Sequence, residues 1–203
     1  MKRSELIRIL DRLESFPHPD PAEEQVRTPA ENAAELLGEA KARDDLAGRI
    51  VADLGAGTGT LAVGAALLGA TRVIAVERDP GALRVAEENA RTLGVEVEWR
   101  EESVDRFREP VDTVVMNPPF GAQRRGADTS FWATAFTVAS RAVYAFSLSQ
   151  SRTFIERRAV ASGARIESCR AVPWVLPHTF AHHRERRRRL PVDLWVLRKE
   201  RDE

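Results

Sequence analysis

The chain has 203 residues, of which 43% are hydrophobic, so it is long enough to bury one hydrophobic core. Lys+Arg and Asp+Glu balance at 31 each, which excludes a global positive field, so any surface that attracts nucleic acid must be local. The single cysteine, Cys169, excludes an internal disulfide and suits the reducing cytoplasm, where we expect the protein to act. We expect no metal site, because CxxC and HExxH motifs are absent, and no membrane span, because the longest apolar run (residues 61–70) is too short.

The N-terminal segment, residues 1–42, predicts a helical arm. Four apolar residues recur at helical spacing and predict a helix over residues 4–15: Leu6, Ile7, Leu10 and Leu13. A proline-rich, irregular connection follows. Thr28 as an N-cap, with Pro29 at the first helical position, then predicts a second helix that runs to Ala42.

From residue 43 onward, strand patterns alternate with helix patterns. The predicted strands are residues 49–55, 72–77, 95–99, 112–117, 142–146, 165–172 and 192–197. The predicted helices are residues 60–70, 80–93, 129–140 and 151–162. This alternation is typical of the α/β class, with an open, mostly parallel sheet covered by helices on both faces. Because no repeat or linker interrupts it, we predict a single domain over 1–203, made of the arm and a core over 43–203.

A glycine-rich turn follows the first predicted strand of the core. The sequence DLGAGTG (53–59) places three glycines where the backbone can approach a ligand without a Cβ in the way. Its GxGxG spacing after an aspartate differs from the GxGxxG of nicotinamide-binding turns. Glu77 ends the next strand and can accept hydrogen bonds from both hydroxyls of a ribose. The pair indicates a nucleoside ligand, whereas the alternative is a mobile turn followed by a solvated charge.

The motif NPPF (117–120) ends the predicted strand over residues 112–117. The glycine turn, Glu77 and NPPF together resemble class I S-adenosylmethionine-dependent methyltransferases, within them the N6-adenine group. The resemblance implies a Rossmann-like sheet of about seven strands, with the last strand antiparallel, and S-adenosyl-L-methionine as the cofactor. Both motifs fall at carboxyl ends of strands, where open α/β sheets bind ligands.

The residue types in NPPF suit methylation of an exocyclic amine. The Asn117 side-chain oxygen and the Pro118 carbonyl can accept the two amine hydrogens and direct the nitrogen lone pair at the methyl donor. Pro119 extends a stiff loop that has no N–H to donate, and Phe120 offers a flat face for the base. The alternative is that these residues only terminate a strand.

Five blocks of sequence carry a closer resemblance, in the order EQVRTP (24–29), VADLGAGTGTLAVGA (51–65), MNPPFG (116–121), RAVY (141–144) and LPHTF (176–180). They resemble the small archaeal and eukaryotic family that N6-methylates one adenosine in small-subunit ribosomal RNA. The resemblance implies a set of cofactor-binding residues: Gln25, Thr28, Asp53, Gly55, Gly57, Glu77, Ser103 and Asn117. Ser103 stands where the family usually has an aspartate that faces the adenine of the cofactor. Eukaryotic members work with a small zinc-ribbon activator protein, which is therefore an expected partner.

The segment AHHRERRRR (181–189) is the densest basic run, with five arginines against one glutamate. Such a run can contact RNA phosphates, although a solvated loop before an edge strand is the alternative. Its histidines are expected at the surface rather than on a metal. In the eukaryotic members a His-Lys pair stands where this chain has Ser147 and Leu148, so no RNA contact is expected there. The predicted RNA-binding residues are Arg124, Arg125, His183, Arg184, Arg186 and Arg187.

The predicted function is methyl transfer to the N6 amine of an adenosine in RNA, with small-subunit ribosomal RNA as the first candidate. One alternative is a glutamine N5-methyltransferase acting on a release factor, but such enzymes resemble one another in a tyrosine where this chain has Phe120. A DNA adenine methyltransferase is disfavoured because a chain of this size leaves little room for a sequence-reading module. A cofactor-binding ribosome-assembly factor without catalysis is the third alternative.

Overall fold

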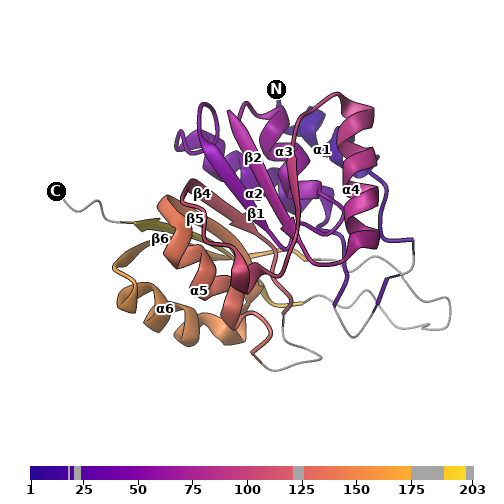
Figure 1. Ribbon diagram of the computed structural model, residues 1–203. Helices are drawn as coiled ribbons and strands as arrows, with labels where there is room; N and C mark the ends of the chain where they lie inside the picture. Colours follow the sequence, from indigo (N-terminus) through magenta and orange to yellow (C-terminus); the bar gives the residue numbers. More distant parts are fainter. Residues whose placement is uncertain (18, 21–23, 121–125, 175–189, 200–203) are drawn as a thin grey trace.

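The computed structural model describes residues 1–17, 19–20, 24–120, 126–174 and 190–199, and contains one seven-stranded sheet (Figure 1). The strands are β1 (Ile50–Leu54), β2 (Arg72–Glu77), β3 (Glu98–Glu101), β4 (Val111–Met116), β5 (Ala139–Leu148), β6 (Ala164–Val172) and β7 (Val192–Lys199). Their order is β3-β2-β1-β4-β5-β7-β6. The pairs among β1 to β5 are parallel, whereas β7 is antiparallel to both β5 and β6. The prediction of a mostly parallel sheet with an antiparallel last strand is confirmed.

The helices are α1 (Arg3–Asp11), α2 (Ala30–Ala42), α3 (Thr60–Leu67), α4 (Pro80–Leu93), α5 (Thr129–Val138) and α6 (Arg152–Ala161), with short 3-10 turns at Val104–Arg106 and Ser149–Ser151. They cover both faces of the sheet, as predicted (Figure 1). One face packs against α1, α2 and α3, with Leu10, Leu36 and Leu37 fully buried. The other packs against α5 and α6, around Trp132 and Trp195.

The start of α2 differs from the prediction. Pro29 occupies the N-cap position, the helix begins at Ala30, and no side chain caps it. The predicted N-cap role of Thr28 is therefore wrong. The Thr28 hydroxyl instead accepts a hydrogen bond from Asn117, 89 residues away along the chain. A tertiary contact of this kind has no local signature in the sequence.

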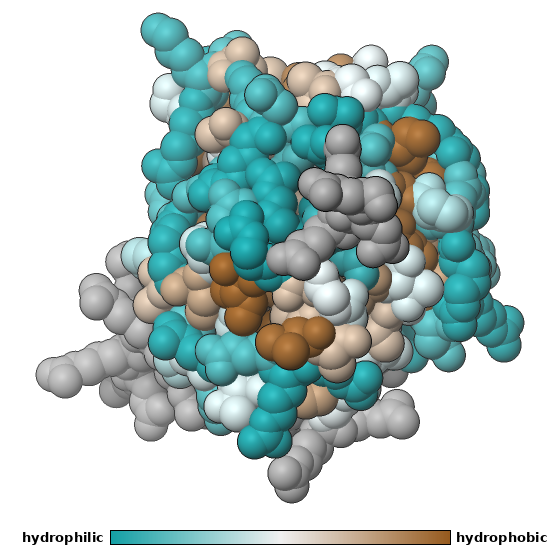
Figure 2. All heavy atoms as spheres, turned by 90° about the vertical axis from the view of Figure 1, so that its left-hand side faces the viewer, coloured by the Kyte–Doolittle hydropathy of each residue, from teal (hydrophilic) through white to brown (hydrophobic). Residues whose placement is uncertain are grey.

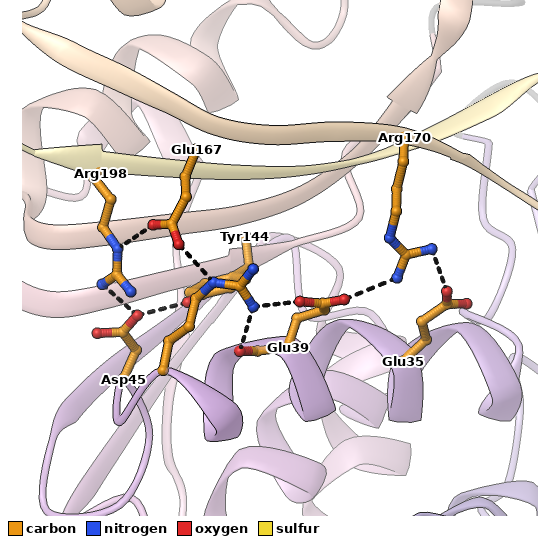
Figure 3. A network of polar contacts seen from close by, with 8 residues as sticks. Glu35, Glu39, Asp45, Tyr144, Glu167, Arg170 and Arg198 are labelled. Atoms are coloured by element: carbon orange, nitrogen blue, oxygen red, sulfur yellow. Dashed lines mark hydrogen bonds and ion pairs between the residues drawn. The ribbon is translucent and has the colours of Figure 1, made fainter.

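A buried carboxylate fixes the loop after α2 to the sheet (Figure 3). Asp45 is fully buried, accepts a hydrogen bond of 2.6 Å from the Tyr144 hydroxyl, and pairs with Arg198 at 2.5 Å and Arg141 at 3.2 Å. Burial raises the pKa of Tyr144 above its ordinary value, and the hydrogen bond and charge of Asp45 raise it further. A buried charge is tolerated because it is paired and hydrogen-bonded in this way.

Further ion pairs join α2 to the C-terminal strands (Figure 3). Glu167 on β6 accepts hydrogen bonds from Arg198 (2.7 Å) and from Arg43 at the end of α2 (2.9 Å). Arg170 on the same strand bridges Glu35 (2.6 Å) and Glu39 (3.0 Å) of α2. These contacts hold α2 and the loop after it against β6 and β7, two strands that lie far from them along the chain.

The last strand of the chain is not at an edge of the sheet. β7 lies between β5 and β6, so the edges among the described strands are β3 and β6. One alternative for residues 181–189 was a solvated loop before an edge strand. The part of this alternative that concerns the edge strand is wrong, because the strand that follows is β7, which is internal. In the part of the chain that the structure describes, no helix is long and apolar enough to cross a membrane.

Candidate active site

A cavity of about 970 Å³ lies at the carboxyl ends of the central strands. The strand register explains why the predicted residues meet there. Leu54 at the end of β1 pairs with Val76 on one side and with Met116 on the other. The residues that follow these positions, the glycine turn, Glu77 and Asn117, therefore emerge at one level and line the cavity together.

The glycine turn is held by hydrogen bonds. The backbone nitrogens of Gly55 and Ala56 donate to the Val76 carbonyl at 2.8 and 3.0 Å, and that of Gly57 donates to the Glu77 carboxylate at 2.8 Å. Gly55 and Gly57 have φ of +74° and +54°, which favours glycine. A Cβ on Gly55 would come within 2.6 Å of the Phe131 ring. The alternative of a mobile turn does not fit these contacts.

Asp53 is a buried carboxylate with one unused oxygen. Its Oδ2 accepts a hydrogen bond of 2.8 Å from the backbone N–H of Ala62, whereas its Oδ1 meets no hydrogen-bonding group of the described residues. Burial raises the pKa of Asp53 to about 7, opposed by the Ala62 N–H and reinforced by the charge of Glu77. A buried carboxylate oxygen that receives no hydrogen bond from the described residues suits a cationic donor on a ligand.

Glu77 is oriented by the backbone that follows it. Its Oε1 accepts hydrogen bonds from the N–H groups of Arg78 (2.8 Å) and Asp79 (2.9 Å), and its Oε2 accepts from Gly57. Each carboxylate oxygen has more than one lone pair, so capacity remains for the hydroxyls of a ribose. The alternative of a merely solvated charge at Glu77 does not fit these hydrogen bonds.

The segment 24–28 forms a strap that connects both sides of the cavity. Gln25 Nε2 donates to the Asp79 carboxylate at 2.7 Å, beside the end of β2. Thr28, which is buried, accepts from Asn117 Nδ2 at 3.0 Å, beside the end of β4. Burial would raise the pKa of Asp79, but hydrogen bonds from the Gly81 N–H and from Gln25 outweigh it and lower that pKa.

The NPPF residues combine an open acceptor with a supported aromatic ring. Asn117 Oδ1 is buried, and no group within the described ranges donates to it. Pro118 is buried, and Pro119 lines the cavity. Phe120 packs edge-on against Trp174 with ring centroids 5.5 Å apart, and Trp174 packs against Phe146 at 5.0 Å.

Comparison with known proteins identifies the family. Residues 29–144 match the family model described as the methyltransferase small domain. The chain belongs to this methyltransferase family. It is also 30% identical over 209 residues to the rRNA N(6)-adenosine-methyltransferase Mettl5 of Drosophila melanogaster, covering 96% of this chain and 95% of the relative. METTL5 of Danio rerio is 29% identical, covering 95% of this chain and 97% of that protein.

A solved structure agrees with this assignment. The crystal structure of PH1948 from Pyrococcus horikoshii superposes with a TM-score of 0.90 at 38% identity, and 98% of each chain is covered. The chain is therefore a member of the Mettl5 family, and the predicted Rossmann-like class I fold is confirmed. S-Adenosyl-L-methionine is the cofactor of this methyltransferase.

Ser103 and its neighbours line the same cavity, after the end of β3. The Ser103 side chain hydrogen bonds to Asp105, and this bond lowers the pKa of Asp105. Asp105 itself lines the cavity, so an acid is present two residues after the position where the resemblance placed it. This acid was not predicted, because it falls outside the position that the family pattern marks.

Several other cavity residues were missed in the sequence. Phe16 from the connection after α1 and Phe131 from α5 both face the glycine turn, and Asp79 holds Gln25. Asp79 directly follows Glu77-Arg78 and could have been found as a second acid, but no motif marks the two phenylalanines. The predicted RNA-binding residues Arg124, Arg125, His183, Arg184, Arg186 and Arg187 lie outside the described residues. In the described ranges, no three His, Cys, Asp or Glu side chains gather as metal ligands would.

Proposed function

We propose that this protein transfers a methyl group from S-adenosyl-L-methionine to the N6 amine of an adenosine in ribosomal RNA, first of all in the small subunit. The observation that carries the proposal is Asn117 Oδ1, a buried hydrogen-bond acceptor without a donor in the described structure, on a residue that lines the cavity of about 970 Å³. The exocyclic amine of adenine has two N–H groups, and one of them can supply the hydrogen bond that this oxygen lacks. Relatives that cover nearly the whole chain carry the same activity in their names.

The cofactor would be held by groups from four strand ends. Asp53 Oδ1 suits the cationic amine of its methionine part, and Glu77 suits the ribose hydroxyls. The cofactor supplies an electrophilic methyl group on a positively charged sulfur. The remaining proposed contacts come from the glycine turn, the strap and the ends of β3 and β4: Gly55, Gly57, Gln25, Thr28, Ser103 and Asn117.

The substrate adenine would be bound by NPPF. The Asn117 Oδ1 and the Pro118 carbonyl would accept the two N–H groups of the amine, which turns the nitrogen lone pair toward the methyl group. Phe120 would stack on the base, a contact worth roughly 1–3 kcal/mol in comparable complexes. Its edge-on packing against Trp174 fixes the ring before the base arrives.

Charge is distributed along the chain in a way that favours an RNA partner. Residues 1–110 contain 15 Lys+Arg against 22 Asp+Glu, whereas residues 111–203 contain 16 against 9. On and after α6, Arg157 and Arg165 are exposed and make no ion pair in the described structure, and Arg158 lies over the exposed Phe154 ring at 5.5 Å. Figure 2 shows this end of the sheet as a largely hydrophilic surface with small separate apolar spots.

We expect these arginines to contact phosphate groups of the substrate. The double variant R157A/R165A should weaken RNA binding and reduce its salt dependence, because fewer counterions are released. The affinity of the variant for the cofactor should not change, because neither α6 nor β6 lines the cavity. Filter binding of the RNA at several salt concentrations measures both its affinity and the salt dependence of that affinity.

A zinc-ribbon activator is proposed as an additional partner, and the cytoplasm as the site of action. The sheet edges β3 and β6 are where such a protein could pair. On β3, Glu98 is engaged by Arg72 and Arg100 at 2.5 Å each. Among the described residues, the exposed large hydrophobic side chains lie on neither edge: Met1, Val26, Phe154 and Val160. We therefore expect an activator to pair with the backbone of an edge strand rather than to cover exposed apolar side chains there.

The test uses purified protein, its Asn117→Ala variant and a radiolabelled methyl donor. Small ribosomal subunits, naked ribosomal RNA and a release factor are offered separately, with and without a zinc-ribbon activator. Labelled RNA is then digested to nucleosides. Label in N6-methyladenosine that disappears in the variant supports the proposal, provided that calorimetry shows cofactor binding in both proteins. Label on the release factor would replace the proposed substrate with glutamine, and binding without any transfer would favour the assembly factor.

A further inference from the structure

The hydrogen bond between Thr28 and Asn117 joins the strap to the residue that would hold the substrate amine. Asn117 Nδ2 donates to Thr28 Oγ1 at 3.0 Å, and Asn117 Oδ1 is left without a donor from any described residue. An amide side chain has one donor end and one acceptor end, and only the acceptor end can receive an amine hydrogen. We infer that Thr28 is a positioning residue for catalysis, which holds the Asn117 amide with its oxygen toward the substrate.

Both partners are restricted before any ligand binds. Each is followed by a proline, Pro29 after Thr28 and Pro118 after Asn117, and a proline limits the preceding backbone to extended conformations. Thr28 is only 7% exposed, so its hydroxyl has little access to water as a substitute partner. Among the described residues, the orientation of the amide therefore depends on this hydrogen bond.

The support of Thr28 comes from α2, which begins two residues later at Ala30. Asn32 on this helix donates to the Pro173 carbonyl at 2.9 Å, next to Trp174 and its contact with Phe120. The ion pairs of Figure 3 hold the far end of α2 to β6. One helix thus positions both the amide of NPPF, through Thr28, and the support of its aromatic ring.

This inference assigns Thr28 to the substrate amine, whereas the family resemblance assigns it to the cofactor. The two roles differ in what a substitution changes. A cofactor contact affects the dissociation constant of the cofactor, while a positioning residue affects kcat at saturating cofactor. Gln25 on the same strap is a useful comparison, because its partner Asp79 lies on the β2 side, away from NPPF.

The experiment compares Thr28→Val, which keeps the shape and removes the hydroxyl, with Thr28→Ser, which keeps the hydroxyl. The inference rests on the proposed function, so kcat is measured on the RNA that the wild-type protein methylates. Thr28→Val should lower kcat roughly ten- to hundredfold, because a buried donor loses its partner and the amide is free to turn. Thr28→Ser should retain most of kcat, and Gln25→Leu should mainly raise the cofactor dissociation constant.

A second readout does not depend on activity. The side-chain amide signal of Asn117 in a 15N-edited NMR spectrum, assigned by its loss in Asn117→Asp, should shift in Thr28→Val and stay close to its wild-type position in Thr28→Ser. An unchanged amide signal together with an unchanged kcat in Thr28→Val would overturn the inference. A wild-type protein that methylates no RNA but shows the NMR effect would overturn the proposed function and leave the positioning of Asn117 in place.

Discussion

The carboxylate of Asp53 should make the ligand-free protein less stable as the pH rises. Its pKa in the folded protein is raised from 3.8 to about 7, chiefly by burial. The folded state therefore binds this proton more tightly than the unfolded state, so the contribution of Asp53 to stability is fully present below pH 3.8 and is lost as the pH rises through about 7. The difference between the two values corresponds to a cost of roughly 4 kcal/mol once the group is ionised.

The variant Asp53→Asn should remove this pH dependence. Linkage gives a cost of about 1.7 kcal/mol for the wild-type carboxylate at pH 5 and about 4 kcal/mol at pH 8. The stability of the variant relative to wild type should therefore improve by roughly 2.5 kcal/mol between these two pH values. Any fixed cost of placing an amide in the pocket is the same at both and cancels in the difference.

The assay is urea unfolding of both proteins at pH 5 and pH 8 without cofactor. Glu87→Gln, an exposed acid on α4, is the matched control and should show no such change. A relative stability of Asp53→Asn that is equal at the two pH values would refute the reasoning. In calorimetry, the same variant should bind the cofactor about 10- to 100-fold more weakly, because a charge-assisted hydrogen bond is lost.

Three further predictions concern packing, the buried ion network and the thiol. Gly55→Ala should lower the free energy of unfolding by about 1–3 kcal/mol and impair cofactor binding, because φ is +74° and the new Cβ would meet Phe131; urea unfolding and calorimetry measure both. Asp45→Asn should cost about 3 kcal/mol or more in the same unfolding assay, because Arg198 would lose its buried counterion. Cys169 should react with iodoacetamide at pH 7.5 much more slowly in the native than in the urea-unfolded protein, because burial raises the pKa of its thiol to about 11; mass spectrometry follows the modification.

Each of these predictions has its own control or opposing outcome. Gly38→Ala in α2 meets no atom within 4 Å of the added Cβ and should stabilise the helix by about 0.5–1 kcal/mol, opposite in sign to Gly55→Ala. Unfolding of Asp45→Asn at the wild-type urea concentration would mean that the network adds no stability. Equal alkylation rates in the native and unfolded states would show that Cys169 is not protected by the fold.

The sequence by itself was enough to predict how strands and helices follow one another along the chain and which residues stand at the strand ends. Apolar runs and helical spacing depend on neighbours within a few positions, and so do the glycines at 55 and 57 and the motif NPPF. Asp79 caps α4 through a hydrogen bond to the Gly81 N–H, and Gly94 ends that helix in the left-handed conformation, both of which follow from local chemistry. Family resemblance then connected these local patterns to a cofactor and a reaction.

Only the tertiary structure decided which distant residues meet. Thr28 had the pattern of a helix cap, yet its hydroxyl binds Asn117, because the strap passes over the ends of the strands. The last strand enters between β5 and β6, and Asp45 is buried against Tyr144, 99 residues away. Contacts of this range depend on how the sheet is ordered and on which charges must be paired once they are buried, and neither is encoded in any short stretch of the chain.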